Sequence, residues 1–183
     1  MAANRHLVLR ADDIMAFQLP HAQHYLSQEI LGGENTALHD SFLNQGTLRP
    51  HMALGGGAHP HHDEIYYVIS GRGSIRLGGD PHTGAGADTY LVEAGSVVYI
   101  PANSFHALRN DSDHDIVFLT IWPQRTSPGD NGMHDERIKA WGTAFRVNEG
   151  CQVHETSQGL FVTAPDRHWN PLLAEPAADE VLR

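Results

Sequence analysis

The feature that most constrains this 183-residue chain is a long region in which short apolar runs alternate with turn-forming residues. From residue 41 to 123, β-branched and aromatic runs are separated by Gly, Pro, Asn and Asp, with almost no helical periodicity. This pattern predicts an all-β region of short antiparallel strands, closed into a barrel or folded as two sheets. The predicted strands cover residues 47–54, 64–70, 73–79, 89–95, 96–101, 105–110 and 115–122.

The segments on either side of this region have different patterns. We expect residues 1–40 to form an N-terminal extension that packs on the barrel, with a short helix near 14–17. Residues 41–124 are the predicted barrel core. Residues 125–183 are predicted to be an accessory segment with a helix at 133–142, because alone they lack the apolar residues for a second core.

The composition of the chain limits its possible binding partners and its cellular compartment. The formal net charge is −10 and no cluster of Lys and Arg is present, which argues against nucleic-acid binding and favours a small-molecule substrate. The N-terminal residues include too few consecutive apolar side chains for a signal peptide or a membrane span. A single cysteine, Cys151, cannot form a disulfide framework, so we expect a cytoplasmic protein.

The segment GAHPHHDE crowds histidines and carboxylates against the start of a predicted strand. Alternate residues of a strand point the same way, so His59 and His61 would share one face and could bind one metal ion. If the chain turns at His62 and Asp63, the Glu64 carboxylate can reach the same ion. Asp63 could then orient a histidine ligand or serve only as a turn residue. His62 remains an alternative ligand to His61, and a solvated polar loop remains the alternative to a metal site.

A second segment, GSVVYIPANSFHALRN, makes a metal site the better interpretation. Gly95, Pro101, His106 and Asn110 stand at fixed intervals in it, and a strand, a turn and a second strand would bring in a third imidazole from His106. Asn103 falls in the predicted turn.

These two segments resemble the two motifs of the cupin superfamily, over about a third of the chain. The first motif reads glycine, five residues, His-x-His, three or four residues, Glu, six residues, glycine. Glu64 and Gly71 fit its second half, but only two residues separate His61 from Glu64. In the family's longer spacing, His59 takes the second histidine position and Gly57 the first. His61 or His62 must then substitute, or the site loses a ligand.

In the second motif Asn103 takes the place of a glycine, so the resemblance implies positive φ at this residue. The resemblance also implies a double-stranded β-helix, or jelly-roll barrel, that binds one divalent transition-metal ion. The implied metal ligands are His59, His61, Glu64 and His106, with His62 as the alternative. Imidazoles with one carboxylate suit Fe, Mn, Ni, Zn, Co or Cu, and the sequence does not choose among them. By the two-residue period, Tyr66 points inward with Glu64, where it would line the pocket or act in catalysis.

Three functions are compatible with such a site, since a fold does not determine a reaction. The leading expectation is a metal-dependent dioxygenase acting on a small organic substrate. The alternatives are a redox-neutral isomerase or lyase that uses the metal as a Lewis acid, and a non-catalytic binding module.

The strand at 64–70 predicts an apolar outer face as well. Tyr67 and Ile69 should point away from Glu64, so this face needs a cover. We expect a homodimer to supply it, as the resemblance also implies, while coverage by the chain's own tail is the alternative.

Overall fold

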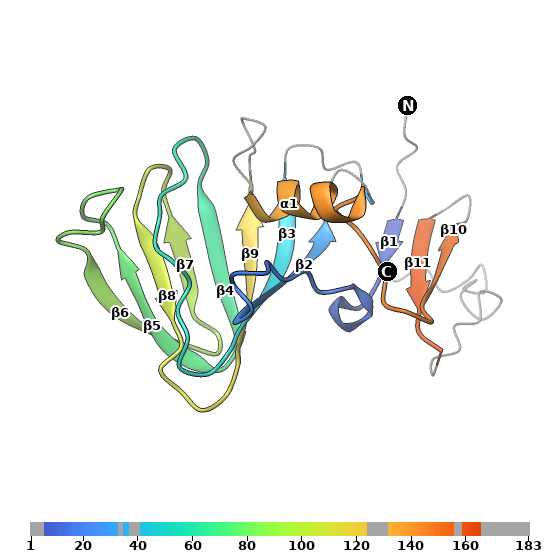
Figure 1. Cartoon of the computed structure of the whole chain (residues 1–183), viewed down its shortest axis with the longest axis horizontal. Helices are drawn as coiled ribbons and strands as arrows, with labels where there is room; N and C mark the ends of the chain where they lie inside the picture. The colour runs from blue at the N-terminus through green and yellow to red at the C-terminus, as the bar shows by residue number, and fades with distance from the viewer. Residues whose placement is uncertain (1–5, 33–34, 37–40, 124–131, 156–158, 166–183) are drawn as a thin grey trace, which may run out of the picture.

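The computed structural model describes residues 6–32, 35–36, 41–123, 132–155 and 159–165 of the chain. In these ranges nearly all regular structure is β-strand, arranged in three sheets (Figure 1). A five-stranded sheet has the order β2-β3-β9-β4-β7, and a three-stranded sheet has the order β6-β5-β8. A third sheet, β1-β11-β10, lies at the opposite end of the molecule from β6-β5-β8.

Paired strands run antiparallel, except that β1 and β11 are parallel. The five-stranded sheet comprises β2 Tyr25–Leu31, β3 Phe42–Leu48, β9 Ile116–Trp122, β4 Glu64–Ser70 and β7 Val97–Ile100. The three-stranded sheet comprises β6 Asp88–Glu93, β5 Arg72–Leu77 and β8 His106–Arg109. The end sheet comprises β1 His6–Val8, β11 Gly159–Thr163 and β10 Gln152–Glu155.

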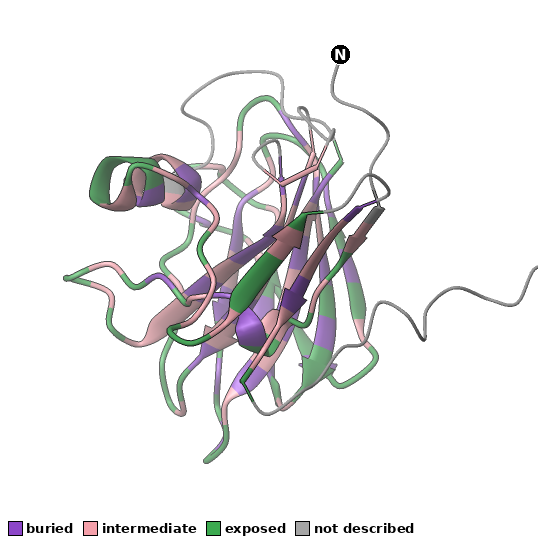
Figure 2. Ribbon diagram, turned by 90° about the vertical axis from the view of Figure 1, so that its right-hand side faces the viewer, coloured by how far each residue is buried: buried purple, intermediate pink, exposed green. Residues whose placement is uncertain are grey.

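The hydrophobic core lies between the five-stranded sheet and β6-β5-β8. Strand β9 shows why these residues form strands, because its buried positions alternate strictly with half-buried ones, as Figure 2 shows for several strands. The core cluster draws on both sheets: Leu48, Tyr66, Val68, Ile75, Val92, Val98, Ile100, Leu108, Ile116 and Phe118. The predicted all-β architecture of two packed antiparallel sheets is therefore confirmed.

Two local predictions in the N-terminal part are wrong. The first barrel strand, β3, ends at Leu48 instead of spanning 47–54, because Pro50 cannot donate to a strand ladder and the chain turns there. The helix expected near 14–17 is also absent from the described structure. A 3-10 turn occupies Ala11–Asp13, and the residues after it pair with other segments through isolated β-bridges.

Gly71 is the single residue between β4 and β5. β4 and β5 belong to different sheets, so the chain crosses from one sheet to the other at this point. Gly71 adopts a φ of 86°, and a Cβ there would lie 2.5 Å from the carbonyl oxygen of Asp115. The positive φ of Gly71 thus serves a crossing between two sheets.

Helix α1, Gly132–Trp141, agrees with the helix predicted at 133–142. It lies over β2 and β3 (Figure 1), and its Arg137 donates hydrogen bonds to Ser27 and Glu29 of β2 and to Asn44 of β3. Strand β2 thus belongs to the main sheet although it lies within the predicted extension. The three-part division of the chain stays a prediction, since much of 125–183 lies outside the described residues.

The outer face of β4 is exposed, as its sequence period predicts. Tyr67 and Ile69 are exposed there, and the neighbouring edge strand β7 adds Val97, which is 67% exposed, and Tyr99. The homodimer that would cover this face stays a prediction. Among the described residues, no helix has both the length and the apolar character to cross a membrane.

Candidate metal centre

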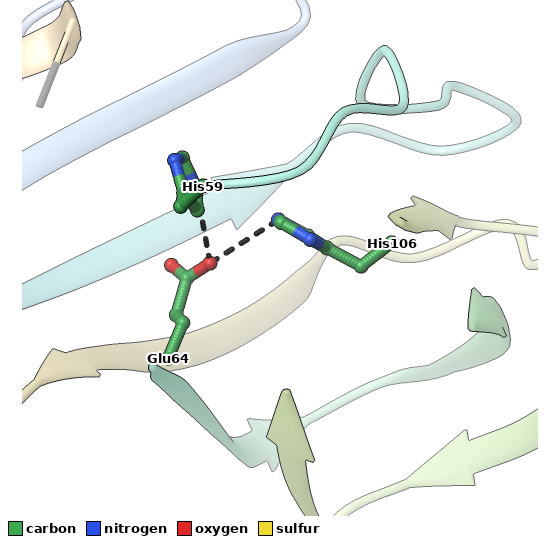
Figure 3. Close-up of side chains that lie close together, drawn as sticks. All are labelled: His59, Glu64 and His106. Carbon is green, nitrogen blue, oxygen red and sulfur yellow. Dashed lines mark ion pairs between the residues drawn. The ribbon is translucent and has the colours of Figure 1, made fainter. Parts of the chain in front are cut away.

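Three side chains from different parts of the chain meet at one end of the barrel core (Figure 3). Glu64 is the first residue of β4, His106 is the first residue of β8, and His59 lies in the segment before β4. The Glu64 Oε2 atom lies 3.2 Å from Nε2 of His106 and 3.4 Å from Nε2 of His59. Glu64 and His106 are buried, whereas the side chain of His59 is 30% exposed.

Backbone hydrogen bonds fix the segments that carry these side chains. Gly57 and His106 exchange two hydrogen bonds, and the carbonyl oxygen of His59 accepts one from the amide of Asn103. Asn103 adopts a φ of 59°, which confirms the positive φ predicted for it. Asp63 accepts hydrogen bonds from the Tyr99 hydroxyl and the Ala102 amide, so it ties the loop before β8 to the start of β4.

The hydrogen bond of His106 sets its tautomer. Its Nδ1 lies 3.2 Å from the carbonyl oxygen of Ser104. A carbonyl oxygen only accepts, so Nδ1 carries the proton and Nε2 of the neutral ring presents a lone pair to Glu64. A lone pair facing a carboxylate oxygen is repulsive unless a cation lies between them. The arrangement therefore calls for a proton or a metal ion at this point.

The electrostatics of the pair agree with this requirement. Burial raises the pKa of Glu64, but the imidazoles of His106 and His59 outweigh burial and lower it to about 2. Burial lowers the pKa of His106, but its hydrogen bond and charge interaction with Glu64 outweigh burial and raise it. The ionised form of Glu64 is thus favoured, and it attracts a positive charge to the space between itself and the two histidines.

The donor atoms have the spacing that one transition-metal ion requires. Donors about 2.1 Å from an ion, at angles of roughly 90–110°, are about 3.0–3.4 Å from one another. The two distances to Glu64 Oε2 are 3.2 and 3.4 Å, and all three ligand atoms lie within 4.8 Å of one another. Two imidazoles and one carboxylate are also a common ligand set for transition metals. His59, Glu64 and His106 therefore fit such an ion.

The expected pairing of His59 with His61 is not found. His61 is exposed and lies outside the group, because the chain bends at Pro60 and His61 and the two-residue period of a strand does not apply. His62 is turned inward instead and is buried. Its ring stacks on that of His59 at 4.7 Å and lies 4.0 Å from that of Trp122. His62 thus packs beside the group but is not among the three clustered donors.

Trp122 is a member of the site that the sequence analysis missed. Its Nε1 donates a 2.7 Å hydrogen bond to Oε1 of Glu64, which leaves Oε2 to face the two imidazoles. The indole ring also lies 4.7 Å from the ring of His59. The alternation along β9 indicated that Trp122 points inward, but nothing in the sequence placed it against Glu64.

A cavity of about 910 Å³ opens onto the three side chains. Tyr66 lies in its wall, and its ring meets that of His106 edge-on at 6.1 Å. Burial, with smaller contributions from Glu64 and Tyr25, raises the pKa of Tyr66 well above 10, so its hydroxyl stays protonated. The cavity lining also includes His21 and His24 from the N-terminal segment and Met133, Glu136 and Lys139 from α1.

The fold and this group define a β-protein whose core lies between two of its sheets and whose candidate metal centre lines a cavity. Residues 47–122 match the family model of the cupin domain. Two solved structures share the fold. A predicted oxalate decarboxylase from Thermotoga maritima has a TM-score of 0.54 and 21% identity, over 64% of this chain and 98% of that chain. The oxalate decarboxylase of Lactobacillus farciminis has a TM-score of 0.50 and 17% identity, over 61% of this chain and 31% of that chain. Residues 47–122 of this chain therefore match the cupin domain, and the predicted cupin fold is confirmed for this region.

Two curated relatives match parts of the chain. A glucose-6-phosphate isomerase of Thermococcus onnurineus is 34% identical over 92 residues, which are 49% of this chain and 44% of the relative. The uncharacterized protein SCO3923 of Streptomyces coelicolor is 37% identical over 65 residues, which are 35% of this chain and 54% of the relative. The chain thus spans about half the length of the curated relatives that it matches.

Proposed function

We propose that this protein is a metal-dependent cupin enzyme in which His59, Glu64 and His106 hold one divalent transition-metal ion. The observation that carries the proposal is the buried carboxylate of Glu64 with two imidazole nitrogens within 3.4 Å, at the inner end of a large cavity. A purely structural pair would have no need of a cavity of this kind. A small organic substrate would enter the cavity and reach the site.

A bound ion would supply Lewis acidity and, if it is iron, reactivity with dioxygen. The chain's own residues have separate tasks. Trp122 holds Oε1 of Glu64, and Ser104 holds the ring of His106, so both ligands are oriented before an ion binds. Tyr66 can donate a hydrogen bond to substrate, but as a protonated phenol it is not the base. Leu54, Leu108 and Met133 exclude water from the cavity wall.

We favour a dioxygenase-type reaction because of the ligand set. Two histidines and one carboxylate with open coordination positions are the set that non-haem iron oxygenases use. The described residues bring together three such donors, and the cavity gives substrate access to them.

A redox-neutral isomerase is the second candidate, and the curated relative supports it. The named activity of the Thermococcus onnurineus relative is glucose-6-phosphate isomerase, and the identity of 34% covers about half of this chain. An isomerase needs a group that moves a proton between neighbouring carbons. His21, His24 and Glu136 line the cavity and are the described titratable groups that we would test for this role.

Anaerobic reconstitution with Fe²⁺ tests both candidates. Elemental analysis should find about one ion per chain, as a site of this kind binds a single metal. Oxygen consumption should then follow the addition of a small oxo acid, a phenol or a diketone. A parallel assay without oxygen should follow the interconversion of an aldose phosphate and a ketose phosphate by proton NMR.

The outcomes separate the candidates. Oxygen consumption coupled to loss of substrate supports the dioxygenase, and anaerobic interconversion supports the isomerase. Glu64→Gln is the matched control, since it keeps the shape of the side chain and removes its charge. If neither iron nor any other divalent transition metal binds the wild-type protein, the proposal is wrong.

A further inference from the structure

The position paired with His106, Gly57, carries no side chain. Gly57 and His106 form an isolated antiparallel bridge, with hydrogen bonds of 3.2 Å from the Gly57 amide and 2.9 Å from the His106 amide. Residues paired directly across antiparallel strands project their side chains to the same face. A side chain at position 57 would therefore stand next to the His106 imidazole, on the side of the metal ligands.

Neither the backbone nor the packing requires glycine at this position. Gly57 does not have positive φ, and among the described residues no heavy atom lies within 4 Å of a Cβ built on it. Its neighbour differs, since a Cβ on Gly56 would lie 2.2 Å from the ring of Phe105. Gly71 is also constrained, by a φ of 86°. The absence of a side chain at Gly57 thus leaves open space next to His106.

The ligand count shows what that space is for. The described residues offer three clustered donors, so a six-coordinate ion would keep three positions for other ligands. A fourth protein ligand at position 57 would reduce them to two. Three positions accommodate a ligand that binds through two oxygen atoms and still leave one position for water or dioxygen.

Charge selects the type of ligand. Two neutral imidazoles, one carboxylate and a divalent ion leave one net positive charge in a buried site, and a buried charge requires a partner. An anionic chelator supplies that partner. The cavity lining also includes His21 and His24, whose ring N–H groups can donate to an anion, and Lys139, which pairs with Glu136 at 3.5 Å.

We propose that Gly57 keeps a coordination position open beside His106, so that the centre binds a 2-hydroxy or 2-oxo carboxylate through two oxygen atoms. This inference rests on the proposed function, because it requires a metal ion on His59, Glu64 and His106. It adds the chemical class of the ligand and the residue that admits it.

The test compares wild-type protein with Gly57→His and Gly57→Ala after loading with Co²⁺, whose visible absorption reports on its ligands. Pyruvate and glycolate are the chelating probes, and acetate is the matched probe with a single carboxylate. We expect wild-type protein to bind pyruvate or glycolate at least about tenfold more tightly than acetate. Gly57→Ala should behave in the same way, because its methyl group fits the space and is not a ligand.

Gly57→His should bind Co²⁺ more tightly by about 10–100-fold, measured by competition with a chelating dye, because it adds a ligand. The new imidazole would take one of the three positions and the space beside His106, so pyruvate and glycolate should bind at least about tenfold more weakly than to wild-type protein. Unchanged Co²⁺ affinity and an unchanged probe response would overturn the proposal. If Gly57→His does not fold, the comparison of acetate with glycolate on wild-type protein and Gly57→Ala decides. If Co²⁺ binds and the two probes bind equally, only the proposed chelation is refuted. If Co²⁺ does not bind, the proposed function is refuted as well.

Discussion

Two glutamates are buried among the described residues, and the difference between their partners distinguishes a structural cluster from a candidate reactive one. Glu29 of β2 is 2% exposed and lies 2.7 Å from Nδ1 of His134 and 3.1 Å from Nη1 of Arg137. Glu64 of β4 is 4% exposed and faces two imidazoles and an indole N–H. Both carboxylates are buried and both have histidine partners, but only one of them also has a guanidinium.

That guanidinium changes what the cluster can do. Arg137 is fully buried and always carries its charge, so the charge of Glu29 is neutralised by the chain itself. Ser27 and Asn44 accept further hydrogen bonds from the same side chain. Around Glu64 the described partners include no permanent cation, and the cavity reaches the carboxylate. The first cluster holds α1 on the sheet, and the second has a place for a cation from outside.

The largest effect should come from breaking the first cluster. Arg137→Met removes the cation and leaves Glu29 buried without it, so the free energy of unfolding should fall by about 3–5 kcal/mol. Urea denaturation measures the loss. Lys139→Met, on the exposed face of the same helix, should change it by less than about 0.5 kcal/mol. A loss of under about 1 kcal/mol in Arg137→Met would contradict a structural role for the cluster.

The second prediction removes the charge of the other glutamate. Glu64→Gln should weaken metal binding by more than about 100-fold, because a ligand is lost and such a loss exceeds the effect of changes around ligands. Competition with a chelating dye measures the affinity. Glu93→Gln, at an exposed position of β6, is the control and should bind metal as the wild-type protein does. Equal affinities for all three proteins would mean that the two buried glutamates do not differ as we infer.

A smaller effect is expected from the hydrogen bond that orients Glu64. Trp122→Phe keeps the ring stacking and removes the Nε1 donor, so metal affinity should fall by about 10–100-fold. The control is Trp141→Phe in α1, where the indole ring packs edge-on against Phe17, away from Glu64. If Trp141→Phe weakens metal binding as much as Trp122→Phe does, the effect is one of general stability and the hydrogen bond is not responsible.

The smallest effect should be found at His61. Because it is exposed and outside the donor group, His61→Ala should change metal affinity by no more than about twofold. His62→Ala should cost more, since the buried ring packs on His59 and Trp122. Isothermal titration with Co²⁺ compares the two variants. If His61→Ala loses more metal affinity than His62→Ala, then His61 is the ligand, as the two-residue period of a strand alone suggests.

The strands were predictable wherever burial followed the two-residue period. β4 and β9 alternate apolar residues that face the core, and their positions agree with the prediction. β2 was missed because its inward positions carry Ser27 and Glu29 instead of apolar residues. Those polar residues are buried only because Arg137 reaches them from another part of the chain, and no local pattern reveals such a partner.

The candidate site was predictable to a similar extent and for a similar reason. His59, Glu64 and His106 stand in short segments whose spacing identifies them, and the structure brings the three together. Whether His61 or His62 points inward depends on where the chain bends, because a shift of one residue turns a side chain to the opposite face. The contact between Trp122 and Glu64 depends on how β9 lies beside β4. This is a long-range contact that the sequence does not show.

The cluster that fixes α1 also has a consequence for the order in which the chain can fold during synthesis. Glu29 and Arg137 are separated by 108 positions in the sequence. Ribosomes add about 5–20 residues per second, so roughly 5–20 s pass between the two residues. During that time β2 can pair with β3, but its inward carboxylate has no guanidinium. The strand that enters the main sheet first is therefore completed by one of the last elements to be made.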